Sequence, residues 1–212
     1  MRPTTPEEYR VPAGYGEALL VEKKSRFIGH VWPVADEPEA LARIAEMRAL
    51  HWDATHNVFA YRIRGGQTRY SDDGEPQGTS GQPTLNVFES EGIENVCCVV
   101  TRYYGGILLG AGGLVRAYSK AAKAALDAAG ISLMRQWDVL LLACPYPLFE
   151  RMKTLIAAHD GVIETTEFGA DVLIQALVPT PGTAAFTQSV LDLSSGGIEP
   201  AVIESVFRAA RL

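Results

Sequence analysis

Apolar and polar residues follow two different periods along the first 130 residues of the chain. Alternation with a period of two predicts strands, and apolar residues three or four positions apart predict helices. The first 17 residues are rich in proline and glycine and predict an irregular lead-in. The predicted elements are two strands within 18–34 around a basic turn at 23–26, a helix over 38–50 capped by Asp36 and presenting Leu41, Ile44, Ala45 and Leu50, a hairpin of strands 57–64 and 67–70, a loop over 71–84, a helix over 85–91, an apolar central strand over 96–102, and a helix over 114–129 that ends at Gly130.

The remaining residues predict two consecutive strand–helix–strand units. Strands are predicted over 137–143, 162–168, 171–178 and 198–207, and helices over 147–159 and 183–193. The order β-α-β-β-α-β within about 75 residues is that of a ferredoxin-like unit. The sequence therefore predicts an α+β protein of two domains, residues 1–134 and 135–212.

Composition places the chain among ordinary globular proteins. Of its 212 residues 47% are hydrophobic and 21% charged, and no apolar run approaches the roughly 18 residues of a membrane span. The polar N-terminus lacks the apolar segment of a signal peptide, and three cysteines without metal spacing argue against disulfides and zinc. These features predict a cytoplasmic protein with no membrane contact, no metal and no cofactor.

Charge is divided unevenly between the two predicted domains. Residues 1–135 hold 15 lysines and arginines against 16 acidic residues, whereas residues 136–212 hold 4 against 9. The acidic second half should repel a phosphate backbone over most of its surface. Any contact with a polyanion is therefore expected in the first half.

The loop over 71–84 places three carboxylates within four positions, at Asp72, Asp73 and Glu75. Paired carboxylates can hold Mg²⁺ or act as general acid and base, although the spacing does not fit a calcium-binding loop. Acidic residues also favour solvated turns, and composition alone favours that structural role. Both interpretations stay open, and the three residues are candidates for catalysis.

Two histidines flank the junction between the first helix and the next strand. His51 and His56 enclose Asp53, a grouping that suits a base with an orienting carboxylate, or a pair of metal ligands. The spacing of five does not place both rings on one helix face, and no third ligand is near. A packed or hydrogen-bonded histidine is the favoured interpretation, with His56 kept as a catalytic candidate.

Five glycines follow the central strand within a dozen positions, in the run from Val99 to Lys120. Gly110, Gly112 and Gly113 lead directly into a helix, where exposed N–H groups at the positive end of the dipole can bind an anion. Neither a Walker loop nor a dinucleotide fingerprint is present. Alternatively, the glycines let a tight loop pack against the sheet.

Four segments, in their order and spacing, resemble the IMPACT family, whose bacterial members are YigZ-like. They are KKSRFIGH, HNVFAYRI, RYSDDGEPQGTSGQP and VVTRYYGGILLGAGGLVRAYSKAA. The resemblance covers about residues 16–130 and implies a first domain with the fold of domain 2 of ribosomal protein S5. The second domain resembles the small ferredoxin-like domain of bacterial members, which is similar to modules of elongation factor G. The family commonly has a cysteine where this chain has Val58.

Two functional hypotheses follow from the residues and the resemblance together. The eukaryotic relatives regulate translation through a stress kinase, which implies a cytoplasmic regulator that binds RNA, the ribosome or a protein partner. The alternative is an enzyme for a phosphorylated or nucleotide substrate, and it requires the acidic loop and the glycine-rich turn to converge on one pocket. The oligomeric state is not predicted. The candidate ligand- and anion-binding residues are Arg69, Arg102, Tyr103, Gly105, Gly106, Gly110, Gly112, Gly113 and Arg116.

Overall fold

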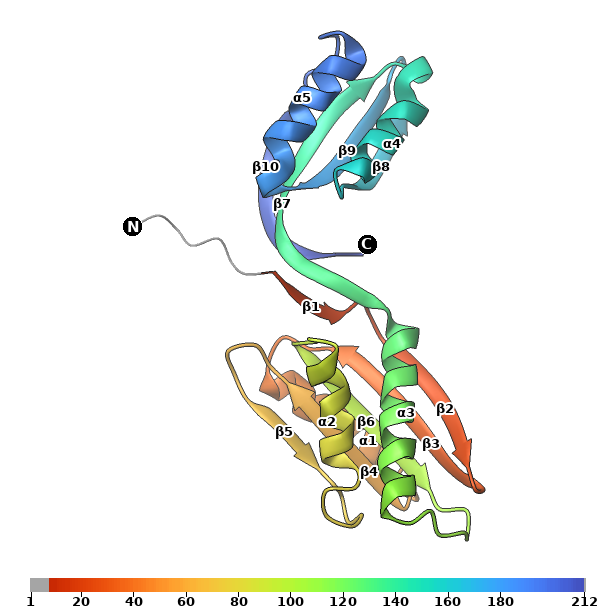
Figure 1. Ribbon diagram of the computed structural model, residues 1–212. Helices are drawn as coiled ribbons and strands as arrows, with labels where there is room; N and C mark the ends of the chain where they lie inside the picture. The colour runs from red at the N-terminus through yellow and green to blue at the C-terminus, as the bar shows by residue number, and fades with distance from the viewer. Residues whose placement is uncertain (1–7, 212) are drawn as a thin grey trace. The chain divides into compact units, whose positions relative to one another are not determined.

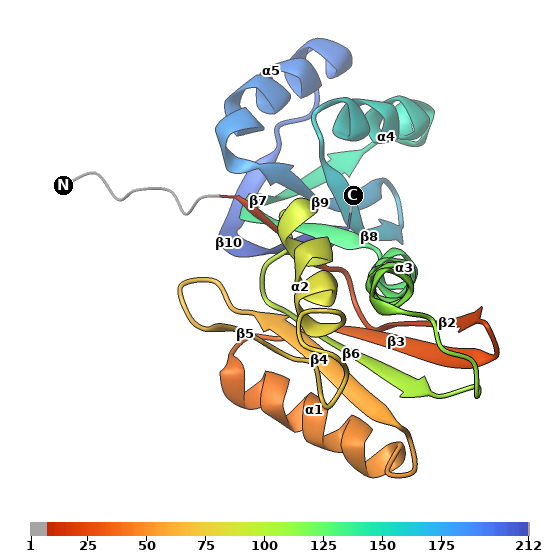
Figure 2. The same ribbon diagram turned by 60° about the horizontal axis from the view of Figure 1, so that its bottom comes forward.

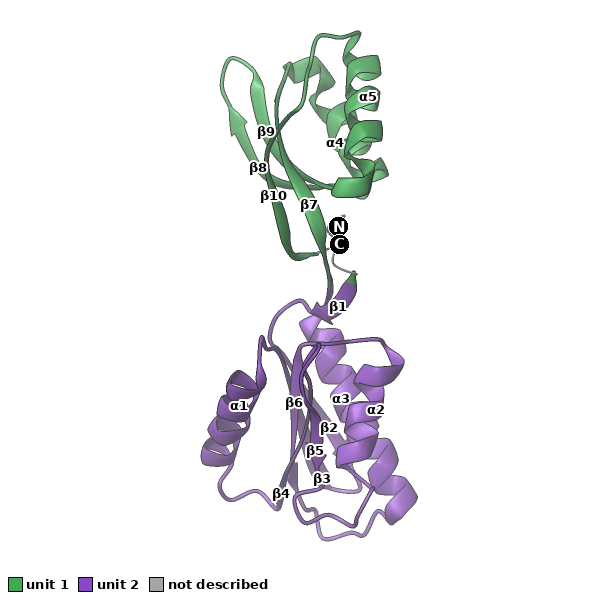
Figure 3. Ribbon diagram, turned by 90° about the vertical axis from the view of Figure 1, so that its left-hand side faces the viewer, with its two compact units in different colours: residues 1–8, 133–212 green, residues 9–132 purple. Residues whose placement is uncertain are grey.

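The computed structural model describes residues 8–211 and contains two compact units. One unit comprises residues 9–132, and the other comprises residue 8 together with residues 133–211 (Figure 3). Each unit has its own antiparallel sheet and its own helices. The α+β class predicted from the sequence is confirmed.

The N-terminal unit is built on a five-stranded antiparallel sheet in the order β2-β3-β6-β4-β5 (Figure 1). Strand β6, the apolar strand predicted to be central, lies between β3 and β4. Helices α2 and α3 cover one face of the sheet and α1 covers the other (Figure 2). The elements are β1 (Tyr9–Pro12), β2 (Gly16–Glu22), β3 (Ser25–Pro33), α1 (Glu37–Leu50), β4 (His56–Arg62), β5 (Thr68–Ser71), α2 (Gly81–Ser90), β6 (Val96–Tyr103) and α3 (Ala111–Ala129).

Each face of this sheet buries its own apolar layer. Small residues along α3, together with Leu114 and Tyr118, pack against β3 and β6. On the opposite face, α1 buries Ala40, Ile44 and Met47 against the outer side of the same strands. Burying these side chains removes apolar surface from water, which is the main stabilising contribution to such a fold.

Several predicted boundaries of the N-terminal unit are wrong. Strand β1 occupies part of the expected irregular lead-in, of which residues 1–7 lie outside the described residues. Helix α1 leaves Leu41 and Leu50 exposed, because Ala40 and Met47 supply the buried stripe instead. Helix α2 begins at Gly81 inside the predicted loop, and α3 begins at Ala111, so Gly112 and Gly113 lie in its first turn.

Other local predictions for this unit are confirmed. Asp36 caps α1 by accepting a hydrogen bond from the Glu39 N–H at 2.9 Å. The basic turn between β2 and β3 is present, with Lys23 and Lys24 in the left-handed region at φ 45° and 67°. Side chains with a Cβ adopt this region at some cost, so the turn is a strained one.

The C-terminal unit has the ferredoxin-like strand order β10-β7-β9-β8 that the sequence predicts. Helices α4 and α5 pack on one face of the sheet over a core that includes Leu140, Met152, Ile174 and Phe186. The first strand begins earlier and the last begins later than predicted. The elements are β7 (Ile131–Cys144), a short 3₁₀ turn (Tyr146–Leu148), α4 (Phe149–Ala158), β8 (Val162–Phe168), β9 (Val172–Pro179), a second 3₁₀ turn (Thr180–Gly182), α5 (Thr183–Ser194) and β10 (Ala201–Arg211).

Candidate functional site

The acidic loop and the glycine-rich turn of the N-terminal unit meet at one pocket of about 420 Å³. We call it the glycine-turn pocket. Its size falls within the roughly 300–1,000 Å³ of small-molecule sites. The convergence that the enzymatic hypothesis requires is therefore present. The lining residues are Thr55 and His56 at the start of β4, Gly74, Glu75 and Pro76 from the loop, Arg102 and Tyr104 at the end of β6, and Leu108, Leu109, Gly110, Ala111 and Leu114 around the start of α3.

A buried ion pair forms one wall of this pocket. Arg102 Nη1 donates to Glu75 Oε1 at 2.5 Å, and the Tyr118 hydroxyl donates to the same oxygen at 2.8 Å. Burial and the adjacent Glu75 carboxylate raise the pKa of Tyr118 far above its usual value, so its hydroxyl stays protonated. The guanidinium lies 5.3 Å from the ring of Phe27 and 5.4 Å from that of Tyr104. Glu75 is thus held by two donors.

His56 presents one ring nitrogen to the pocket. Its Nδ1 lies 2.8 Å from the backbone oxygen of Asp73, which can only accept, so Nδ1 carries a proton in this contact. The other nitrogen, Nε2, lies 3.8 Å from Glu75 Oε2. Gly74 has φ 87° and lies beside the ring, so that a Cβ added to it would be 3.5 Å from His56 Nδ1. In the neutral ring Nε2 is a hydrogen-bond acceptor in a fixed orientation.

Asp72 and Asp73 organise the acidic loop. Asp72 accepts hydrogen bonds from the N–H groups of Gly78, Ser80 and Gly81, and from the Ser80 hydroxyl. Burial alone would raise the pKa of Asp72, but these hydrogen bonds outweigh it and lower the pKa overall. Asp73 accepts from the Asn57 N–H at 2.7 Å and from Arg48 at 3.0 Å. Neither carboxylate lines the glycine-turn pocket, and a catalytic role for them stays a prediction.

The predicted anion-binding residues do not form one site. Arg69 lies 3.7 Å from Glu37 on the edge strand β5. The Tyr103 hydroxyl contacts His51 and donates to Asp53. His56 takes no part in these contacts and bonds to the Asp73 backbone instead. Gly105 packs on the β2–β3 turn, where an added Cβ would lie 2.1 Å from the Lys24 carbonyl carbon, and Gly106 has φ 80°. Arg102 and Gly110 line the glycine-turn pocket, whereas Gly113 and Arg116 line a second pocket.

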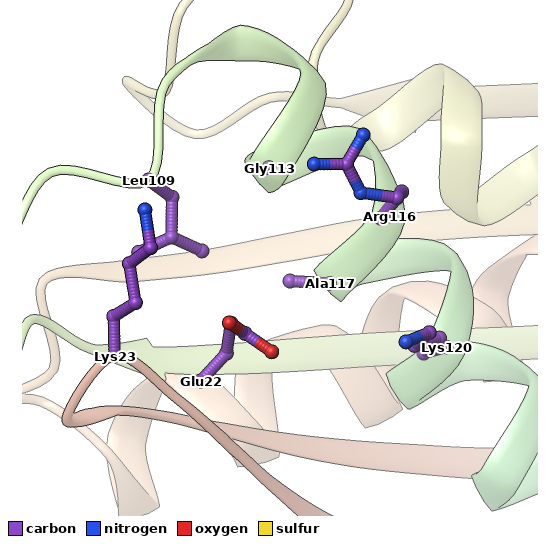
Figure 4. A pocket seen from close by; sticks show the side chains of 7 residues that line it. All are labelled: Glu22, Lys23, Leu109, Gly113, Arg116, Ala117 and Lys120. Atoms are coloured by element: carbon purple, nitrogen blue, oxygen red, sulfur yellow. The ribbon is translucent and has the colours of Figure 1, made fainter.

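The second pocket, of about 80 Å³, lies between the β2–β3 turn and the outer side of α3 (Figure 4). Three cations from these two elements surround it, Lys23, Arg116 and Lys120, together with Glu22. Arg116 extends back along the helix, and its Nη1 would lie 3.5 Å from a Cβ placed on Gly112. We call Lys23, Lys24, Arg116 and Lys120 the basic surface.

Some site residues were missed by reasoning from the sequence. Lys23 was placed in a basic turn, but nothing in the sequence brings it beside Lys120, which is nearly a hundred positions away. Tyr118 and Leu108 lie within the last of the four family motifs, but neither of them is assigned a role from the sequence. Among residues 8–210, no group of three or more histidine, cysteine or acidic side chains is arranged to hold a metal ion. No helix in the described part of the chain is long and apolar enough to cross a membrane.

The fold and the site define a two-domain α+β protein with a ligand-sized pocket in its first unit, and comparison with known proteins gives its family. The Impact N-terminal domain matches residues 23–126, and a domain of unknown function, DUF1949, matches residues 142–196. The chain belongs to the IMPACT family. The resemblance seen in the sequence motifs is confirmed.

Bacterial relatives match most of the chain, and a mammalian relative matches half of it. IMPACT family member YvyE of Bacillus subtilis (strain 168) is 34% identical over 183 residues, covering 85% of this chain and 84% of the relative. IMPACT family member YigZ of Escherichia coli (strain K12) is 34% identical over 203 residues, covering 93% and 99%. Protein IMPACT of Mus musculus is 36% identical over 115 residues, covering 50% of this chain and 35% of the relative. A crystal structure titled as a hypothetical protein has 34% identity and a TM-score of 0.58, covering 93% of this chain and 98% of that one.

Proposed function

We propose that this protein is a cytoplasmic regulator linked to translation, which binds the phosphate backbone of RNA through the basic surface of its N-terminal unit. The link to translation rests on the family, whose eukaryotic relatives regulate translation. The choice of RNA over other partners rests on the charges of this chain. The observation that supports it is a group of cations without carboxylate partners in a protein of net charge −6.

Most other arginines and lysines of the described residues lie within 4 Å of a carboxylate. Examples from both units are Arg48 with Asp73, Arg64 with Glu94, and Arg208 with Glu164. In contrast, Lys23, Lys24, Arg116 and Lys120 have no carboxylate within ion-pairing distance in the part of the chain that is described, and all four are exposed. Cations free of local partners can neutralise phosphates and release counterions.

The experiment measures the affinity of the full chain for a single-stranded RNA over a range of salt concentrations. The double variant Arg116→Glu, Lys120→Glu is compared with Arg151→Glu, Lys153→Glu, which changes the net charge equally in the other unit. We expect wild type to lose affinity steeply with salt, and the first variant to lose at least about tenfold at low salt with a shallower slope. The matched control should stay close to wild type.

Two results would count against the proposal. One is an affinity that does not change between low and high salt, because a contact with phosphates must release counterions. The other is an equal loss in both double variants, which would show an effect of net charge without a defined surface. A pull-down from lysate with and without RNase then distinguishes RNA from a protein partner.

A further inference from the structure

We propose that the glycine-turn pocket is a second, independent site, which binds a small molecule the size of a nucleoside monophosphate. The anionic group would lie at the amino end of α3 beside Arg102, and the planar apolar part against Tyr104, Leu108 and Pro76. This inference goes beyond the contact with RNA, which uses the neighbouring basic surface between α3 and the β2–β3 turn. Its chemistry is argued from four features of the pocket.

The first feature is a set of free backbone donors. The first hydrogen bond inside α3 runs from the Leu114 N–H to the Gly110 oxygen at 2.9 Å, and the capping residue Gly110 has no side chain to accept others. Within residues 8–211, the N–H groups of Ala111, Gly112 and Gly113 have no acceptor. Such donors, at the positive end of a helix of 19 residues, attract an anion.

The second feature is an unsatisfied hydrogen-bond donor in the wall of the pocket. The Arg102 side chain is only 6% exposed, and its Nε is buried without a hydrogen-bond partner among the described residues. Its Nη1 is used by Glu75, and its Nη2 lies 3.4 Å from Ser25 Oγ. A buried donor without a partner is costly, so this wall of the pocket favours a ligand that brings a hydrogen-bond acceptor close to the guanidinium.

The third feature is the balance of charge around the pocket. Among residues 8–211, Glu75 is the one carboxylate that lines it, and Arg102 neutralises that charge. Asp72 and Asp73 are turned toward loop amides, Asn57 and Arg48. The remaining charge at the pocket is then the positive partial charge at the amino end of α3. The pocket therefore favours an anion over a cation.

The fourth feature is the apolar rest of the lining, which favours a ligand with an apolar part over a bare inorganic ion. Leu108 is 81% exposed at the pocket, and Tyr104 and Ile107 beside it are also exposed. Exposed apolar side chains around a concave site suit a flat ring that covers them. His56 also lines the pocket, and its ring can form a hydrogen bond with the same ligand. An anion joined to a hydrogen-bonding ring meets all four features.

The test titrates the isotope-labelled full chain with adenosine 5′-monophosphate, adenosine and inorganic phosphate, and follows the amide signals by NMR. We expect the monophosphate to shift the signals of residues 110–113 and of His56. Adenosine and phosphate should each bind at least about tenfold more weakly, since each lacks one half of the contacts.

Variants separate this site from a structural effect and from the basic surface. Leu108→Asp should weaken the monophosphate at least about tenfold without unfolding the chain, because Leu108 is exposed. Leu50→Asp, at another exposed leucine at the end of α1, serves as its control. The variant Arg116→Glu, Lys120→Glu should keep the monophosphate affinity within about threefold while losing RNA.

Four outcomes would overturn the proposal. They are shifts with the monophosphate that avoid residues 110–113, equal affinity for phosphate and the monophosphate, no effect of Leu108→Asp, and no binding of any of the three probes. None of these outcomes affects the salt-dependent binding of RNA, so the two proposals fail separately.

Discussion

At the scale of single residues, His30 is buried with half of its hydrogen-bonding capacity unused. The Tyr15 hydroxyl donates its one proton to Glu17 Oε2 at 2.7 Å, so His30 Nδ1 at 2.9 Å donates to the tyrosine oxygen. His30 Nε2 is then a bare acceptor, and it is buried without a partner in the described part of the chain. The ring stacks 5.6 Å from Trp32 and lies 5.8 Å from His51. This environment disfavours a second proton.

A dependence of stability on pH follows from this residue. Burial lowers the pKa of His30 below its usual 6.5, and His51 adds to the effect while Glu17 opposes it. The folded state therefore binds fewer protons, so the stabilisation is present above about pH 6.5 and is lost as pH falls below it. We expect His30→Phe, which keeps the stacking, to lose less stability between about pH 7.5 and 5.5 than wild type, by up to about 1.4 kcal/mol per pH unit. Urea unfolding at several pH values measures the difference, and parallel curves would contradict it.

At the scale of elements, the glycine-rich turn contains glycines with opposite requirements. Gly105 approaches the backbone of Lys24 and donates its N–H to Ser25 Oγ, so an added Cβ has no room. Gly112 lies in the first turn of α3, where a Cβ would meet only the flexible end of Arg116. We expect Gly105→Ala to destabilise the chain by about 1–3 kcal/mol, and Gly112→Ala to stabilise it by up to about 1 kcal/mol. Denaturant unfolding compares the free energies of unfolding of the two variants. Gly182→Ala serves as a control, because a Cβ at that position contacts no other atom among the described residues. Equal effects of Gly105→Ala and Gly112→Ala would show that close packing does not explain why glycine occupies position 105.

The same turn shows how far the sequence predicts the elements. Strand β6 and helix α3 were expected in place, because an apolar run and an alanine-rich helical pattern are strong local signals. The start of α2 was missed, because the N–H groups of Ser80 and Gly81 are satisfied by the Asp72 side chain, eight and nine positions earlier. A cap supplied from that distance leaves no local signal at the helix start.

The candidate site was predicted in parts. Residues near one motif were found together, such as Glu75 with its loop and Gly110 with its helix. The pairing of Arg102 with Glu75 joins positions 27 apart, and it depends on β6 lying beside β4 in the sheet. Such contacts depend on the order of strands in the sheet, and this order cannot be predicted from periodicity or composition. Of the two roles weighed for the glycines, close packing is seen at Gly105, whereas anion binding by Gly110, Gly112 and Gly113 stays a prediction.

At the scale of the whole molecule, the two units divide the charge, with −1 in residues 1–135 and −5 in residues 136–212. If RNA binds the basic surface, the negative charge of the acidic unit opposes that binding through its electrostatic field, which salt screens. We expect the triple variant Glu167→Gln, Glu199→Gln, Glu204→Gln to bind RNA about two- to threefold more tightly than wild type at about 0.1 M salt. All three side chains are exposed and form no ion pair in the described residues, so folding should be unchanged.

The dependence of this gain on salt is the decisive part of the measurement. The screening length falls from about 10 Å at 0.1 M to about 3 Å at 1 M, so the ratio of affinities should fall toward one as salt rises. The variant Glu167→Asp, Glu199→Asp, Glu204→Asp keeps the charges and should match wild type throughout. A gain that persists at high salt would mean that these residues touch the RNA directly, and the absence of any gain at low salt would mean that the acidic unit does not influence the basic surface. Only a gain that salt removes agrees with a phosphate contact confined to the N-terminal unit.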